Sequence, residues 1–294
     1  MKHNKALGQI SFLIKLLTDR DEFVRNRVQE QLIDLGEDAL PFLEIAVRGG
    51  DDDLRIQANA VIQSILPQKL AEKFRLLAQK GLGQDIDLET GMMLIMEFGY
   101  PNSDPEEFRQ KLDELAQNFA DILNPEAEPP EIVAAFTHFL FQQKGFKGNK
   151  DDYQNPDNSF LNKVLDNQTG LPITLSAICV LLAKRLHLPI VGVGMPGHYI
   201  VKYSLPIEPI YFDPFHQGRL LTKKECIQIV EQFGHSFEEH FLSQATQRET
   251  LIRMLNNLIQ VYKKSNETKK AETLTKYIKI LLNPSKDQQS ERIH

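Results

Sequence analysis

Residues 170–216 read GLPITLSAICVLLAKRLHLPIVGVGMPGHYIVKYSLPIEPIYFDPFH. The stretch begins with an apolar segment that is long enough for a helix, which we expect over Ile173–Leu186. Short runs rich in β-branched and aromatic residues follow at Ile190–Val193, Tyr199–Tyr203 and Ile210–Phe212, separated by turn residues. This pattern predicts a small antiparallel sheet packed on helices. Because the chain is helical elsewhere, we expect a mainly helical α+β fold.

Helical periodicity dominates the chain on both sides of this stretch. Before it, the apolar spacing predicts four helices, over Lys69–Lys80, Leu88–Phe98, Pro105–Ile122 and Glu131–Gln143. After it, Glu249–Lys264 and Thr268–Leu282 predict an antiparallel helix pair of the length used in TPR repeats. Residues 285–294 are rich in polar and charged side chains, so we expect them to be disordered.

The first 66 residues contain a weak internal repeat. Residues 21–28 read DEFVRNRV, and residues 51–58 read DDDLRIQA, with the apolar residue and the arginine at matching places. An acidic helix start followed by such a pair resembles HEAT-type repeats, in which helix pairs stack to share a core. The alternative is an ordinary four-helix segment whose two halves resemble each other by chance.

The composition limits the function classes. The 294 residues carry 34 Lys and Arg against 40 Asp and Glu, a net charge of −6 and a pI near 5.8. The chain as a whole therefore lacks the positive field on which non-specific nucleic-acid binding usually relies, and only a local basic patch stays open. Its apolar runs fall short of the roughly 20 residues of a membrane helix, and we expect neither a membrane span nor a signal peptide. The sequence contains no phosphate-binding loop and no dinucleotide motif, so no cofactor is predicted.

The chain has two cysteines, Cys179 and Cys226. Two cysteines without a Cys-x-x-Cys pair exclude a disulfide-dense scaffold and the usual structural zinc site. This usage fits a reducing cytoplasm. Cys179 lies between Ile178 and Val180 in an apolar helix, so we predict that it belongs to the core, where burial raises the pKa of a thiol.

His198 directly precedes one predicted strand, and Asp213 directly follows the next strand, before Pro214. With the preceding helix, which Pro172 directly precedes, this order resembles the transglutaminase-like core of the papain-type cysteine-hydrolase superfamily. The resemblance implies a catalytic triad of His198, Asp213 and a Cys at the helix start, where the helix dipole stabilises a thiolate. In this chain Pro172 occupies that position, and proline supplies no nucleophile.

Two hydroxyl residues follow Pro172 closely and are candidate substitutes for the missing thiol. Thr174 and Ser176 would form a Ser/Thr–His–Asp arrangement with His198 if either hydroxyl approached the imidazole. The competing interpretation is that both hydroxyls form hydrogen bonds within the helix, which is their more common role there. Cys226 comes after Asp213 in the chain and is out of order for the triad.

The same region offers an alternative based on a metal ion. The spacing from Asp213 to His216 places two ligands on one loop, and His198 would join them from the adjacent strand. Three nitrogen and oxygen ligands with an open position suit catalytic zinc or a non-haem metal. The simpler interpretation of His198 is a structural histidine that is hydrogen-bonded to Asp213.

The resemblance extends over residues 85–284. Its further segments are Asp85–Ile95, Asn158–Leu165, Phe212–Arg219 and Leu251–Leu258. Together with the core they resemble the bacterial SirB-type proteins, also called the transglutaminase-like, TPR-containing family, whose core also occurs in a eukaryotic F-box protein. The family is named for a proposed regulatory role, and the resemblance does not imply a settled activity.

We therefore expect four segments in the chain. They are HEAT-like helical repeats at 1–70, a transglutaminase-like core at 71–245, a TPR-like helix pair at 246–284 and a disordered tail at 285–294.

Two functions remain open from the sequence. The first is a non-catalytic, cytoplasmic regulatory or protein-interaction module that binds a protein or peptide through its helical repeats. The second is a hydrolase or acyltransferase that uses His198 and Asp213 with a non-standard nucleophile or a metal-bound water. Neither nucleic acid nor membrane is expected as a partner.

Overall fold

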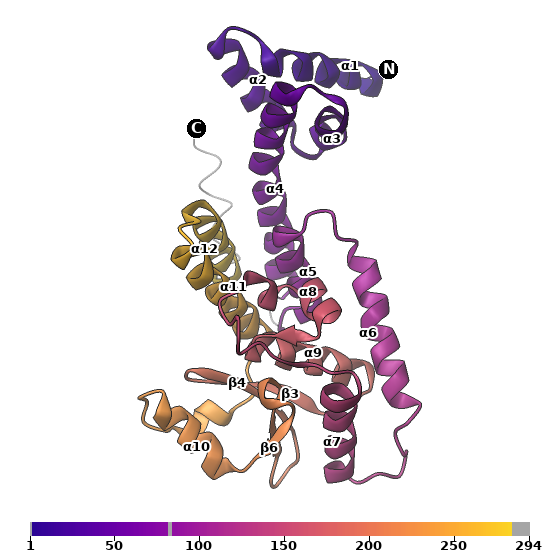
Figure 1. The fold of residues 1–294 in the computed structure, drawn as a ribbon, viewed down its shortest axis with the longest axis vertical. Helices are drawn as coiled ribbons and strands as arrows, with labels where there is room; N and C mark the ends of the chain where they lie inside the picture. Colours follow the sequence, from indigo (N-terminus) through magenta and orange to yellow (C-terminus); the bar gives the residue numbers. More distant parts are fainter. Residues whose placement is uncertain (1, 82–83, 284–294) are drawn as a thin grey trace. The chain divides into compact units, whose positions relative to one another are not determined.

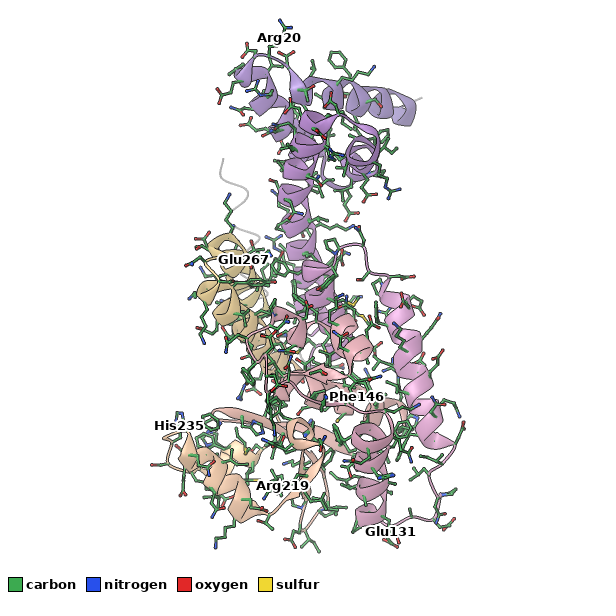
Figure 2. The ribbon with its side chains drawn as sticks, viewed as in Figure 1. Arg20, Glu131, Phe146, Arg219, His235 and Glu267 are labelled. Atoms are coloured by element: carbon green, nitrogen blue, oxygen red, sulfur yellow. The ribbon has the colours of Figure 1, made fainter. Side chains whose placement is uncertain are left out.

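The computed structural model describes residues 2–81 and 84–283 of the chain (Figures 1 and 2). The tail that we predict to be disordered, residues 285–294, lies outside the described residues. The chain folds as two compact units, of which the first ends at Lys73 and the second begins at Phe74. Within the described ranges, every helix is too short or too polar to span a bilayer.

The first unit is a small helical bundle. It contains α1 (Lys2–Lys15), α2 (Glu22–Leu35), α3 (Leu40–Gly49) and the first part of α4 (Asp52–Lys80). Side chains from these helices and from the 3-10 turns between them share one apolar core, whose most buried members are Leu17, Leu32, Ala39, Leu43 and Ala58. Burial of this shared face is what holds such short helices together, since isolated helices of this length are marginal in water.

Helix α4 passes through Pro67 without a break. The prediction of a separate helix that begins at Lys69 is therefore wrong. A proline inside a helix removes one backbone hydrogen bond and strains the preceding turn. Ile65 and Leu70 on either side of Pro67 are both buried, and we attribute the continuity of the helix to this burial.

The second unit begins inside α4, and four further helices follow before residue 170. They are α5 (Leu88–Gly99), α6 (Pro105–Ala120), α7 (Pro129–Thr137) and α8 (Leu161–Asn167). Asp87 and Asp104 cap the first two by accepting hydrogen bonds from backbone N–H groups of the first turn. Helix α7 continues into a π-helical turn, His138–Gln143, so the predicted helix over Glu131–Gln143 changes its hydrogen-bond pattern halfway.

The sheet has four antiparallel strands in chain order. These are β3 (Ile190–Met195), β4 (His198–Tyr203), β5 (Ile210–Asp213) and β6 (Arg219–Leu221). The small antiparallel sheet is confirmed, and three of its strands lie where the sequence places them. Strand β6 was not predicted, because three residues give too short an alternation to detect. A separate two-residue parallel pair joins β1 (Lys147–Gly148) to β2 (Thr169–Gly170).

Helices cover both faces of this sheet (Figure 1). Helix α9 (Pro172–Arg185) packs against β3 and β4 on one face, and almost all of its residues are buried. Helix α10 (Lys223–Gln232) packs on the other face, together with the short 3-10 helix Glu239–Leu242. The core on the α10 side consists of Val193, Met195, Ile200, Tyr211, Leu221, Cys226, Val230 and Leu242.

The second unit ends with the helix pair α11 (Gln247–Lys264) and α12 (Thr268–Leu282). The predicted bounds of the last helix agree with the structure. Helix α11 also packs closely against α5, where a Cβ atom added at Gly91 would lie 2.0 Å from a methyl group of Leu251. A side chain at Gly91 would require Leu251 to move, and α11 and α5 belong to the same compact unit.

Candidate functional site

The turn between β3 and β4 determines where His198 lies. Gly197 has a φ of +75°, a conformation that side chains rarely adopt, and His198 follows it as the first residue of β4. Side chains alternate along a strand, so His198 points to the same face as Ile200, toward α10. By the same alternation Asp213, the last residue of β5, shares a face with Tyr211. Both functional candidates therefore lie on the α10 side of the sheet.

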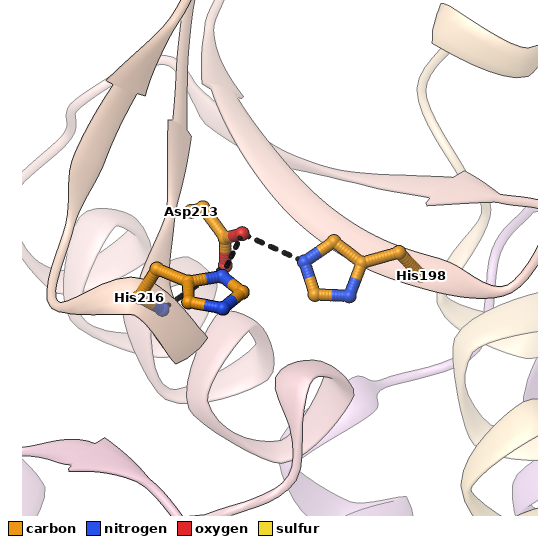
Figure 3. A group of neighbouring side chains, drawn as sticks. All are labelled: His198, Asp213 and His216. Atoms are coloured by element: carbon orange, nitrogen blue, oxygen red, sulfur yellow. Dashed lines mark hydrogen bonds and ion pairs between the residues drawn. The ribbon is translucent and has the colours of Figure 1, made fainter. Parts of the chain in front are cut away.

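Three side chains form a hydrogen-bonded cluster at this end of the sheet (Figure 3). His198 Nε2 lies 2.8 Å from Asp213 Oδ2, and His216 Nδ1 lies 2.7 Å from the same oxygen. The other oxygen, Asp213 Oδ1, accepts the backbone N–H groups of Phe215 and His216 at 3.0 and 3.3 Å. All the interactions of the carboxylate thus come from one adjacent strand and from the turn that directly follows Asp213.

The electrostatics of Asp213 follow from this arrangement. Its burial, with 2% of the residue exposed, by itself raises the pKa of the carboxyl group. The hydrogen bonds and charge interactions with His198 and then His216 outweigh that effect and hold the pKa of Asp213 below its usual value. Asp213 is therefore a carboxylate at neutral pH and fixes the orientation of both rings.

The hydrogen bond to Asp213 uses only one ring nitrogen of His198, Nε2. In Figure 3 the dashed line to Asp213 starts from one ring nitrogen of His198, Nε2, and no such line reaches the other, Nδ1. In the neutral ring with Nε2 donating, Nδ1 carries the lone pair. In this tautomer Nδ1 is a hydrogen-bond acceptor, and His198 is one of the residues that line the adjacent cleft.

Arg253 of α11 holds the backbone of the same turn. Its Nη1 donates to the carbonyl oxygen of Met195 at 2.8 Å, and its Nη2 donates to that of His198, also at 2.8 Å. The guanidinium also lies over the ring of Tyr199, 5.5 Å from its centroid. Sequence reasoning missed Arg253, because a single arginine in an amphipathic helix gives no signal of the loop that it binds.

An open cleft of about 670 Å³ lies in front of the cluster. Pro172, at the first turn of α9, lines it together with His198, so the helix start and the histidine face the same space. The remaining lining is contributed by Tyr153, Gly197, Asp213, Phe215, His216, Arg219, Leu221, Glu225, Gln228, Ile229, Gln232 and Phe233. The α10 wall of this cleft was not predicted, since an amphipathic helix does not reveal which partner its exposed side meets.

The predicted substitute nucleophiles lie elsewhere. Thr174 and Ser176 are fully buried in α9 and do not line the cleft. Ser176 Oγ donates a long hydrogen bond of 3.4 Å to the carbonyl oxygen of Tyr199, whereas Thr174 Oγ1 has no partner among the described residues. The structure therefore brings His198, Asp213 and His216 together and keeps both hydroxyls in the core.

The two thiols are also buried. Cys179 is 1% exposed and Cys226 is fully buried. Desolvation raises the pKa of both thiols, that of Cys226 to about 12. The prediction that Cys179 belongs to the core is confirmed. Among the described residues that line the cleft there is no serine, threonine, cysteine or lysine.

Comparison with known proteins identifies this fold. A family model described as the transglutaminase-like superfamily matches residues 106–256, about half of the chain. The chain belongs to the transglutaminase-like superfamily. The UPF0162 protein of Xylella fastidiosa (strain 9a5c) is 33% identical over 198 residues, which cover 64% of this chain and 69% of that protein.

More distant relatives share shorter regions. The UPF0162 protein of Pseudomonas aeruginosa is 28% identical, over 57% of this chain and 62% of its own length. Human F-box only protein 21 is 30% identical over 142 residues, which cover 46% of this chain and 22% of that protein. No solved structure matches the chain significantly.

Proposed function

We propose that this chain is a non-catalytic, SirB-type transglutaminase-like protein that binds a protein or peptide partner and acts as a regulatory or interaction module. One observation carries the proposal: Pro172 occupies the helix start that shares the cleft with His198. The helix N-terminus is the place where a helix dipole would activate a thiol, and this chain has a side chain there without a nucleophilic atom.

The energetic argument is direct. Loss of a triad nucleophile typically lowers kcat by about six orders of magnitude, and the remaining members do not compensate. Thr174 and Ser176 are buried away from the cleft, and both thiols have raised pKa values. The His198–Asp213 pair then serves to shape the cleft and to offer a hydrogen-bonding nitrogen to a bound ligand.

The helical parts supply the binding surfaces in this proposal. We interpret α11 and α12 as a TPR-like pair and the first unit as HEAT-like repeats, and both architectures present extended surfaces to partners. Four large apolar side chains, one on each helix of the first unit, are more than 60% exposed: Phe12, Phe23, Ile45 and Ile56. Human F-box only protein 21 contains the matched region as about a fifth of its length, so this core also occurs as one part of a larger protein. The two free, buried cysteines support a reducing, cytoplasmic location.

A covalent-probe experiment tests the absence of a nucleophile. The full-length protein is treated with thiol-, hydroxyl- and amide-directed probes and read by intact mass, beside the variant His198→Ala. We expect no stoichiometric adduct that depends on His198. A stoichiometric adduct that His198→Ala abolishes would reveal a working nucleophile and overturn the proposal.

The variant Pro172→Cys tests the geometry on which the proposal rests. A thiol at the first turn of α9, facing His198, gains thiolate character from the helix dipole and the imidazole. We expect Pro172→Cys to form one iodoacetamide adduct, and to react about tenfold faster than Pro172→Cys combined with His198→Ala. If iodoacetamide alkylated Pro172→Cys equally fast with and without His198→Ala, the assignment of Pro172 to the position of the family's nucleophile would be contradicted.

A second function is favoured by the free Nδ1 atom of His198. In this alternative the chain is a hydrolase or acyltransferase in which His198 accepts a proton from water or an acceptor hydroxyl, whose oxygen attacks an ester or amide carbonyl. The proton then passes to the departing alcohol or amine. Hydrolysis of an ester and amide panel that persists in the matched control His235→Ala and disappears in His198→Ala would favour this function over the non-catalytic one.

A further inference from the structure

Asp213 is a buried carboxylate whose side-chain partners are two histidines. Only 2% of the residue is exposed, and its Oδ2 atom meets one ring nitrogen of His198 and one of His216. Imidazole nitrogens and carboxylate oxygens are common ligands of divalent transition metals. The cluster therefore has a ligand set that a cation would complete.

The geometry of the cluster fits metal coordination. Two imidazole nitrogens, one from β4 and one from the turn after β5, converge on a single oxygen, Asp213 Oδ2. The donor atoms of all three residues lie within 4.8 Å of one another. The backbone N–H groups that bind Asp213 Oδ1 orient the carboxylate from behind, as outer-sphere hydrogen bonds do for metal ligands.

We propose that His198, Asp213 and His216 bind one divalent transition-metal ion, with the remaining coordination positions open to the cleft. The ion takes the place of the two protons that the histidines now donate to Asp213. Two histidines and one carboxylate with open positions are the ligand set of non-haem iron and related sites.

One of the three ligands, His216, has room to change its position. The His216 side chain is 46% exposed, whereas that of His198 is 9% exposed and that of Asp213 is 2% exposed. His216 can therefore rotate toward the ion while the two buried ligands stay in place. The cleft gives an ion access from solvent, and a ligand oxygen or nitrogen in the cleft can complete its coordination.

This inference goes beyond the proposed function, because metal binding requires neither a partner nor a nucleophile. The test uses the untagged full-length chain and Co²⁺ as the probe, followed by calorimetry and by its visible spectrum. We expect one Co²⁺ per chain, whose visible spectrum then reports the coordination number. His216→Ala and Asp213→Asn should each weaken binding by at least about tenfold, whereas His235→Ala should leave it unchanged.

The outcomes are distinct. Absence of saturable Co²⁺ binding up to about 1 mM would overturn the proposal. Equal affinity of His216→Ala and His235→Ala would also overturn it, because binding would then be adventitious. His216 is exposed and outside the core, so its removal is expected to leave the fold intact, which circular dichroism of each variant verifies. The covalent-probe result does not depend on any of these outcomes, so failure of one proposal leaves the other standing.

Discussion

Arg253 offers a sharp test of how the fold positions His198. In Arg253→Met the side chain keeps most of its length, but both hydrogen bonds to the β3–β4 turn are lost. Two hydrogen bonds from a charged donor contribute about 1.5–3 kcal/mol each. Burial lowers the pKa of Arg253, so part of that gain is offset by the cost of keeping the guanidinium out of water. We expect a net loss of about 2–4 kcal/mol of unfolding free energy.

The assay is equilibrium unfolding in urea, with Lys263→Met as the matched control, because it removes an exposed cation from the same helix. Arg253→Lys should recover only part of the loss, since an ammonium group lacks the planar fork that reaches two carbonyl oxygens at once. In the Pro172→Cys background, Arg253→Met should also slow alkylation, because the turn that carries His198 loosens. A stability of Arg253→Met within about 0.5 kcal/mol of the control would refute the assigned role.

Three further predictions concern the rest of the fold. Both thiols, Cys179 and Cys226, should resist Ellman's reagent in the native protein and react fully in denaturant, because burial raises their pKa values; fast native reaction would show that the core opens. Gly91→Ala should destabilise the protein by about 2 kcal/mol or more in urea, because its Cβ would overlap a leucine of α11, whereas Gly49→Ala, which meets no atom within 4 Å, should not. Burial by itself raises the pKa of Asp87, but hydrogen bonds from Lys184 and from Thr90 in the first turn of α5 outweigh burial and lower that pKa. The ionised Asp87 therefore stabilises the fold at pH values above 3.8, the ordinary pKa of the group, and this stabilisation is lost as the pH falls through the lowered pKa. Asp87→Asn should therefore lower the melting temperature at neutral pH and differ less from the wild type in strong acid; an equal difference at both pH values would contradict this sign.

The sequence by itself determined the elements whose signal is local. Apolar spacing located α12 at its observed bounds, and β-branched runs located three of the four strands. The resemblance to the transglutaminase-like core added the expectation that His198 and Asp213 meet, and their side chains are hydrogen-bonded. Helical and strand periodicities express the alternation of buried and exposed positions within a few residues, so a single sequence contains them.

Only the tertiary structure decided where α4 ends and which side chains share the cleft. Helix α4 continues through Pro67, because the burial of residues on both sides outweighs the local preference for a break. Thr174 and Ser176 follow Pro172 closely in sequence, yet they point into the core while Pro172 lines the cleft. Arg253 and the α10 wall come from segments that meet the site only after folding. Such contacts depend on packing between segments far apart in the chain, and local periodicity cannot encode them.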